Sequence, residues 1–193
     1  EEVALNYISD CGFRNKLAPM EILGKKVMWK GSFMSAVEIT YRDAHGTVRT
    51  WEALERVGIS GIVVMAAITP AGSILLEKQF RPPLGRDVIE LPAGLVEPGE
   101  SMEAAAKREL IEETGWEAGS IDFLTEGPIS TGASTEMLRA YLCTRLTHVG
   151  RNGGDDNEII EVIDVPLPGV QDYLLTMQKA GTLIDLKVFG LIE

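Results

Sequence analysis

Cysteine and histidine are scarce in this sequence, and each shortage excludes a class of protein. The two cysteines, Cys11 and Cys143, lie far apart without C-x-x-C spacing, which argues against a disulfide framework or a thiolate metal site. The two histidines, His45 and His148, belong to no cluster, so a zinc centre or a serine–histidine catalytic site lacks its parts.

Long apolar runs and basic side chains are also lacking. No apolar run reaches the length of about 18 residues that a membrane span needs. Residues 1–10 lack the basic and apolar regions of a signal peptide, so we expect a soluble, cytoplasmic protein. The 18 Lys and Arg stand against 29 Asp and Glu, a formal net charge of -11. This acidity repels nucleic acid and anionic membranes, and an anionic ligand would need a metal ion or a few arginines.

The hydrophobic pattern predicts a mixed α/β protein. With 193 residues, 45% of them hydrophobic, the chain can form one ordinary core with an N-terminal appendage, so we divide it into residues 1–57 and 58–193. The predicted strands cover residues 35–42, 47–56, 61–69, 73–80, 87–91, 121–127, 136–147 and 158–165. The predicted helices cover residues 102–114, between the N-cap Ser101 and the stop Gly115, and residues 170–179. This irregular order favours a mixed sheet sandwiched by helices over a doubly wound parallel sheet.

The stretch GESMEAAAKRELIEETGW, residues 99–116, places its acids unfavourably for a bare helix. Glu109, Glu112 and Glu113 lie three and four residues apart, so their side chains share one face. They crowd the last turns, where backbone carbonyls already carry partial negative charge. A solvated acidic face would cost only about 0.2–0.5 kcal/mol per pair. The alternative is that a bound cation balances the charge, since a broken local rule often indicates function.

The residues around these acids match a long template. They are Gly94, five residues, Glu100, seven residues, Arg108, Glu109, Leu110, one residue, Glu112, Glu113, one residue and Gly115. This string resembles the signature box of the Nudix hydrolases, a loop–helix–loop that binds divalent metal and cleaves diphosphates linked to another moiety. Trp116 departs from the pattern, because an aliphatic residue is more usual there. The resemblance implies a Nudix-type α/β/α sandwich with a mixed sheet.

The resemblance also implies roles for the box residues. The expected metal ligands are Glu109, Glu112, Glu113 and the backbone carbonyl of Ala93, and Glu112 and Glu113 are counted as catalytic. The expected structural residues are Gly94, Glu100, Arg108 and Gly115, with a salt bridge from Glu100 to Arg108 holding the loop against the helix. Hard carboxylate oxygens suit Mg²⁺ or Mn²⁺, and two or three ions per site are expected.

The flanking motifs narrow the resemblance to one branch of the family. RTWE at residues 49–52, QFRPP at residues 79–83 and the following IELPAGLVEPGE are similar to the ADP-ribose pyrophosphatase branch. That branch hydrolyses ADP-ribose and related nucleoside diphosphate sugars to a nucleoside monophosphate and a sugar phosphate. Thr131 is a departure, since a proline often stands there, and it leaves other sugar nucleotides such as GDP-mannose as an alternative.

By the same resemblance, further residues should bind substrate or activate water. The substrate-binding candidates are Phe33, Trp51, Glu52, Arg56, Arg81 and Glu136. Among them Arg81, and also Arg56, would contact the diphosphate, and Trp51 would stack on the base. Phe33 is either a second stacking aromatic or a hairpin aromatic buried in a core or dimer interface. In the acidic loop, Glu158 is the first candidate for general base or extra metal ligand and Asp156 the second, the alternative being a polar hairpin tip.

The branch commonly exchanges N-terminal strands between two subunits. The resemblance therefore implies a homodimer, in which residues 1–57 dimerise and bind the base while residues 58–193 form the catalytic domain. Two rival functions stay open. A non-catalytic sensing module would usually lose box glutamates, and all are present here. An enzyme for nucleoside triphosphates or capped RNA would not account for the RTWE and QFRPP motifs.

Overall fold

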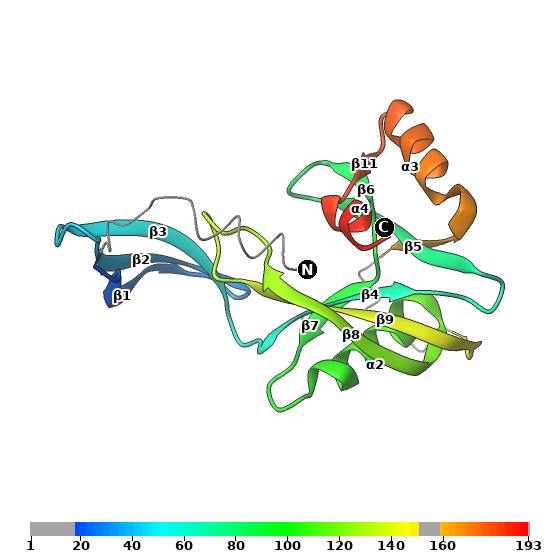
Figure 1. The fold of residues 1–193 in the computed structure, drawn as a ribbon, viewed down its shortest axis with the longest axis horizontal. Coiled ribbons are helices and arrows are strands. Elements are labelled where there is room, and N and C mark those ends of the chain that lie inside the picture. Colours follow the sequence, from blue (N-terminus) through cyan, green and yellow to red (C-terminus); the bar gives the residue numbers. More distant parts are fainter. Residues whose placement is uncertain (1–17, 151–158, 193) are drawn as a thin grey trace, which may run out of the picture. The chain divides into compact units, whose positions relative to one another are not determined.

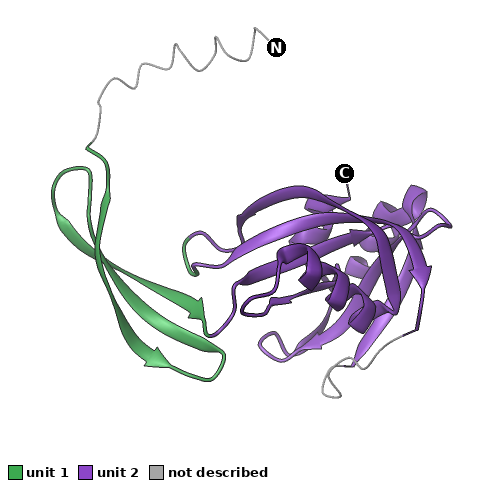
Figure 2. Cartoon of the chain, turned by 90° about the horizontal axis from the view of Figure 1, so that it is seen from below, with its two compact units in different colours: residues 1–57, 132–134 green, residues 58–131, 135–193 purple. Residues whose placement is uncertain are grey.

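The computed structural model describes residues 18–150 and 159–192. The chain divides into two compact units (Figure 2). Unit 1 runs to Val57 and includes Gly132–Ser134, whereas unit 2 comprises Gly58–Thr131 and the chain from Thr135 onward. In the described part, no helix is long and apolar enough to cross a membrane.

From residue 18 onward, unit 1 forms an antiparallel sheet of three strands in the order β1-β2-β3, with β1 at Glu21–Lys30, β2 at Met34–Arg42 and β3 at Val48–Arg56. The carboxylate of Asp43 builds the β2–β3 turn, because its Oδ1 accepts hydrogen bonds from the backbone N–H groups of His45 and Thr47, both at 2.9 Å. The predicted hairpin is therefore confirmed. The sequence analysis did not predict that β1 is a full third strand.

Unit 2 contains two four-stranded sheets (Figure 1). One has the order β7-β4-β9-β8, with β7 at Ala93–Val96, β4 at Gly61–Ala67, β9 at Met137–His148 and β8 at Trp116–Pro128. The other has the order β10-β5-β6-β11, with β10 at Ile160–Pro166, β5 at Ser73–Arg81, β6 at Arg86–Glu90 and β11 at Leu183–Ile184. Each sheet is mixed, because β4 pairs in parallel with β9 and β6 pairs in parallel with β11.

Helices cover both faces of these sheets. In β4, Val63 and Met65 belong to the core cluster under helix α2 (Met102–Thr114), whereas Val64 belongs to the cluster under α3 (Val170–Lys179) and α4 (Leu186–Leu191). This alternation follows from the two-residue period of a strand buried on both sides. The predicted α/β/α sandwich is confirmed (Figure 1).

Most of the long elements follow the predicted boundaries closely, although β8 begins at Trp116, five residues before the predicted start. Helices α2 and α3 begin and end at the predicted residues. The short elements β7, β11 and the 3-10 turn η1 at Leu167–Gly169 were missed. Strands of four and two residues show too little periodicity to be recognised, and they form because neighbouring strands offer hydrogen-bond partners.

Candidate active site

The loop between β7 and α2 is shaped by a tight turn and a helix cap. The backbone N–H of Glu100 donates to the carbonyl of Glu97 at 3.1 Å, and Gly99 takes the left-handed conformation at φ 87°. Ser101 then caps α2, since its Oγ accepts the N–H of Ala104 at 3.1 Å. These local bonds fix where the helix starts, and therefore which helix face carries the acids.

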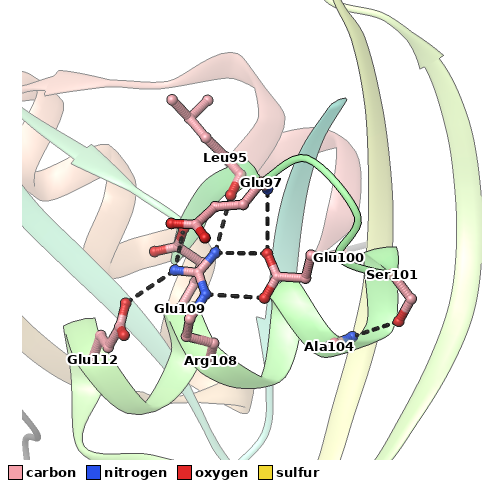
Figure 3. A network of polar contacts seen from close by, with 8 residues as sticks. All are labelled: Leu95, Glu97, Glu100, Ser101, Ala104, Arg108, Glu109 and Glu112. Carbon is pink, nitrogen blue, oxygen red and sulfur yellow. Dashed lines mark hydrogen bonds and ion pairs between the residues drawn. The ribbon is translucent and has the colours of Figure 1, made fainter. Parts of the chain in front are cut away.

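Arg108 is the hub that fastens this loop to the helix (Figure 3). Its Nε and Nη2 donate to the two carboxylate oxygens of Glu100 at 3.0 and 2.9 Å, and Nη2 also donates to the carbonyl of Leu95 at 3.1 Å. Bidentate hydrogen bonds between arginine and a carboxylate are stronger than hydrogen bonds between neutral groups. The hydrogen bonds from Arg108 hold the pKa of Glu100 below its ordinary value.

The same guanidinium also reaches two of the predicted metal ligands. Nη1 of Arg108 lies 2.9 Å from Oε1 of Glu109 and 3.0 Å from Oε2 of Glu112. Burial raises the pKa of the Glu109 carboxyl above its ordinary value, and Arg108 opposes that shift only in part. A partly desolvated carboxylate of this kind gains from a further cation, so the acidic face is better suited to a charged ligand than to bulk water.

Gly94 leaves the space in which Glu109 lies. A Cβ atom at Gly94 would lie 1.9 Å from Cδ and 2.2 Å from Oε1 of Glu109, far closer than real Cβ atoms approach. The box glycine is therefore needed for close approach rather than for an unusual backbone angle. This is a physical reason that the sequence pattern alone did not supply.

Glu113 reaches the strand before the box glycine. Its Oε2 accepts the backbone N–H of Ala93 at 3.1 Å, which places this carboxylate beside the peptide whose carbonyl is the fourth predicted ligand. In residues 18–150 and 159–192, however, no group of three or more His, Cys, Asp or Glu side chains is placed to hold a metal ion. Glu109 and Glu112 are instead engaged by Arg108. By chemistry the donors still fit a hard divalent cation, because all are carboxylate or carbonyl oxygens and one is desolvated.

The C-terminal end of α2 is tied to the end of β9. Gly115 has φ 78°, its N–H donates to the carbonyl of Ile111, and its own carbonyl accepts the N–H groups of Val149 and Gly150 at 2.9 and 3.1 Å. The indole of Trp116 and the ring of His148 meet edge to face, with their centroids 5.1 Å apart. These hydrogen bonds therefore connect the end of helix α2, which carries the predicted metal ligands, to the start of the acidic loop. The two predicted acids of that loop, Asp156 and Glu158, lie outside the described residues.

Arg81 borders a pocket with a volume of about 370 Å³. The pocket lies between the β5–β6 hairpin and β11, and its wall includes Arg81, Leu84, Val88, Glu90, Leu183 and Asp185. Nε of Arg81 is 2.5 Å from Oε2 of Glu90. Sequence reasoning singled out Arg81 but missed Glu90, although Glu90 lies inside the recognised motif that begins at Ile89.

Unit 1 carries four of the predicted substrate-binding residues, and they do not share one face of its sheet. The side chain of Trp51 is half exposed, and its Nε1 donates to the carbonyl of Gly132 at 3.0 Å. Glu52 and Arg56 share the opposite face of β3, because side chains alternate along a strand. Phe33 is 77% exposed, so it is not buried in the core of its own chain.

Glu136 lies on unit 2 and closes a loop. Its carbonyl accepts the N–H of Ile129 at 3.3 Å, and the segment from Ile129 to Glu136 contains Thr131, the position that departs from the branch pattern. Residues Gly132–Ser134 of this loop belong to unit 1, where the carbonyl of Ala133 accepts the N–H of Leu54 at 2.8 Å.

This architecture defines a class of protein: an α/β/α sandwich that presents a carboxylate-bearing helix face fastened to its preceding loop by an internal arginine. The NUDIX domain matches residues 60–183, and the chain belongs to the Nudix family. It is a Nudix hydrolase, and enzymes of this family generally need divalent metal ions.

Individual proteins agree with this family assignment. An uncharacterized Nudix hydrolase of Schizosaccharomyces pombe is 34% identical over 166 residues, which cover 80% of this chain and 81% of that protein. The ADP-sugar pyrophosphatase of Mus musculus is 31% identical over 195 residues, which cover 88% and 84%. A crystal structure described as an ADP compounds hydrolase matches with a TM-score of 0.69 at 21% identity, over 82% of this chain and 84% of that one, and it supports the fold.

Proposed function

We propose that this enzyme hydrolyses the diphosphate bond of nucleoside diphosphate sugars, with ADP-ribose as the first candidate substrate. The observation that carries the proposal is the acidic face of α2, where Glu109 and Glu112 contact Arg108 and Glu113 contacts the N–H of Ala93. A chain of net charge -11 needs such a cation-binding face to accept a dianionic diphosphate. The similarity to a mouse ADP-sugar pyrophosphatase supports the substrate class.

Mg²⁺ or Mn²⁺ is the proposed cofactor, with two or three ions per site. Glu109, Glu112, Glu113 and the carbonyl of Ala93 would hold it, with Glu158 as an additional ligand. When bound, the cation neutralises phosphate charge and makes a water molecule more acidic. For general base we propose Glu158, with Asp156 as the second candidate, because a carboxylate can accept the proton of the attacking water.

The substrate-binding residues are assigned by chemistry. Arg81 can bind the diphosphate oxygens through a planar guanidinium, and Arg56 has the same capacity. We assign the base to unit 1, where Trp51 presents a half-exposed indole and Phe33 an exposed ring. Glu52 and Glu136 are proposed to accept hydrogen bonds from polar groups of the substrate.

A substrate panel tests this function. Purified protein with Mg²⁺ would be offered ADP-ribose, ADP-glucose, GDP-mannose, UDP-glucose, NADH and nucleoside triphosphates, and the products would be separated chromatographically. The proposal expects ADP-ribose to yield AMP and ribose 5-phosphate. Preference for GDP-mannose would move the assignment to the alternative sugar nucleotide. Turnover of triphosphates without any sugar-linked diphosphate would refute it, and binding without any turnover would favour a sensing module.

Trp51→Ala is expected to raise KM for ADP-ribose about 10-fold with little change in kcat, because a base–aromatic stack contributes about 1–3 kcal/mol. Trp51→Phe is the matched control. It keeps an aromatic face but loses the hydrogen bond from Nε1 to the carbonyl of Gly132, so a smaller increase is expected. Initial rates over a range of ADP-ribose concentrations measure both parameters. An unchanged KM in Trp51→Ala would remove this residue from the base site.

We also propose that the enzyme is a homodimer that exchanges its N-terminal strands. Every residue of β1 is exposed in the single chain, including the apolar side chains of Ile22, Val27 and Trp29. A ten-residue edge strand with this composition is an aggregation hazard unless another chain covers it. Light scattering should therefore give a dimer mass, and Trp29→Glu should shift it toward the monomer. A monomeric wild-type protein would contradict the proposal.

A cytoplasmic location is proposed as well. The sequence spacing of the two cysteines is unsuited to a disulfide framework, and Cys143 is a free, buried thiol. Burial raises the pKa of the Cys143 thiol to about 12, so it stays protonated and unreactive at neutral pH. These features are typical of a protein from a reducing compartment.

A further inference from the structure

Arg81 and Glu90 lie on the face of the β10-β5-β6-β11 sheet that is directed toward helix α2. Along β5, Leu75 packs in the core cluster with Ala105 and Leu110 of α2, whereas Ile74 and Leu76 pack toward α3 and α4. Because side chains alternate along a strand, Arg81 shares the face of Leu75. The 2.5 Å contact places Glu90 on that face too.

The pairing register shows that this contact is not between directly opposed residues. Arg81 is opposite Arg86, whereas Glu90 is opposite Glu77. Glu90 therefore lies four residues along β6 from Arg86, the residue opposite Arg81. To meet Glu90, the side chain of Arg81 must extend back along the sheet past Val88, which is 4% exposed.

The backward extension brings the guanidinium toward the box. Glu90 is the last residue of β6, and three residues later Ala93 donates its N–H to Glu113. The side chain of Glu90 is only 14% exposed, so its carboxylate is a fixed partner, while that of Arg81 is 41% exposed and accessible to a ligand. The ion pair uses Nε, and a guanidinium carries four more N–H donors on its two Nη nitrogens.

We propose that Glu90 is a positioning residue that acts through Arg81. Its carboxylate holds the guanidinium of Arg81 at the wall of the 370 Å³ pocket, and the guanidinium binds the diphosphate of the substrate there. The proposal rests on the proposed function and extends it by a residue that itself makes no contact with the diphosphate. Holding Nε in this way leaves the Nη pair to bind phosphate oxygens in the bidentate manner that suits arginine.

A double-mutant cycle tests the proposal. The variants are Glu90→Ala, Glu90→Gln, Arg81→Ala and the double alanine variant, assayed for kcat and KM with ADP-ribose and Mg²⁺. Glu90→Ala should lower kcat/KM about 10-fold, the size expected when one hydrogen bond between charged groups is lost. Glu90→Gln keeps an oxygen acceptor for Nε and should lose less. In the Arg81→Ala background, Glu90→Ala should change kcat/KM by less than about 2-fold, because its effect passes through Arg81.

The matched control is Glu161→Ala. Glu161 forms an ion pair with Lys78, also of β5, at 3.4 Å, but Lys78 faces the opposite side of the sheet from Arg81. Its removal should leave kcat/KM unchanged. Thermal melts followed by circular dichroism check that each variant is folded. If Glu90→Ala does not fold, Glu90→Gln takes its place in the comparison.

A binding measurement separates this inference from the proposed function. Calorimetry with α,β-methylene-ADP, a nucleoside diphosphate that resists hydrolysis at the bridge, requires no turnover. Weaker binding by Glu90→Ala in the wild-type background, and equal binding in the Arg81→Ala background, would support the inference whatever the sugar specificity. A full loss from Glu90→Ala in the Arg81→Ala background would overturn it, since Glu90 would then act independently. A wild-type enzyme inactive on every sugar-linked diphosphate would overturn only the proposed function.

Discussion

Glu113→Gln is expected to lower kcat for ADP-ribose by at least about 100-fold while the protein stays folded. The amide oxygen of glutamine can still accept the N–H of Ala93, which lies 3.1 Å from the carboxylate, so the local geometry is retained. What is lost is one negative charge from the proposed cation-binding face, and charge stabilisation by a bound cation contributes several kcal/mol to such reactions. Initial rates measured across Mg²⁺ concentrations should also show a higher metal requirement.

Glu117→Gln is the matched control for this variant. Glu117 forms an ion pair with Lys107 at 2.8 Å, and both side chains are more than 40% exposed. Removing its charge should leave turnover and its metal dependence unchanged, because exposed pairs contribute little. Near-normal turnover in Glu113→Gln, with the control also normal, would refute the assignment of Glu113 as a metal ligand.

Gly94→Ala is expected to remove most activity with a comparatively small loss of stability. The added Cβ would lie 1.9 Å from Cδ of Glu109, so one of the two groups must move. Because the clash is with the end of a flexible side chain rather than with backbone, Glu109 can rotate away and the fold can persist. The rotation breaks the 2.9 Å contact with Arg108 and takes Glu109 off the acidic face. We expect kcat to fall about 100-fold, because the bound cation would lose one of its carboxylate ligands and would stabilise less of the charge in the transition state.

Two further variants make this test specific. Gly127→Ala is the control, because a Cβ at Gly127 in β8 has no atom within 4 Å and should change neither rate nor melting temperature. The double variant Gly94→Ala with Glu109→Ala has no carboxylate to displace, so it should melt at the same temperature as Glu109→Ala alone. An additional loss of stability in the double variant would show that Gly94 has a backbone role instead.

Much of the active-site frame was predictable from local chemistry. Ser101 and Gly115 define the ends of α2 through a side-chain cap and a left-handed residue, and both act within a few residues of themselves. The spacing of Glu109, Glu112 and Glu113 defines a shared helix face by the period of the helix. These features depend on neighbours in the chain, so the residue order is enough to specify them.

Other features depend on neighbours that are distant in sequence. The bond from Trp51 to Gly132 joins residues 81 positions apart. Neither short-range periodicity nor turn chemistry reports such contacts, which also explains why β11 was missed, since its two residues are ordered by parallel pairing with β6. Strand β1 is a different case, because it pairs with its chain neighbour β2, and the two register shifts in that pairing interrupt the alternation of side chains.

The order of residues was enough to predict a helix with three carboxylates after a glycine loop, a mixed sheet around it, and a Nudix hydrolase. The folded chain was needed to see why Gly94 must lack a side chain, which carboxylates Arg108 engages, and that Arg81 extends back to Glu90. The two sets of features differ in the distance along the chain over which their interactions act. Capping and helix periodicity act over about one turn, whereas the orientation of a long side chain is set by whichever partner the folded strands bring within hydrogen-bonding distance.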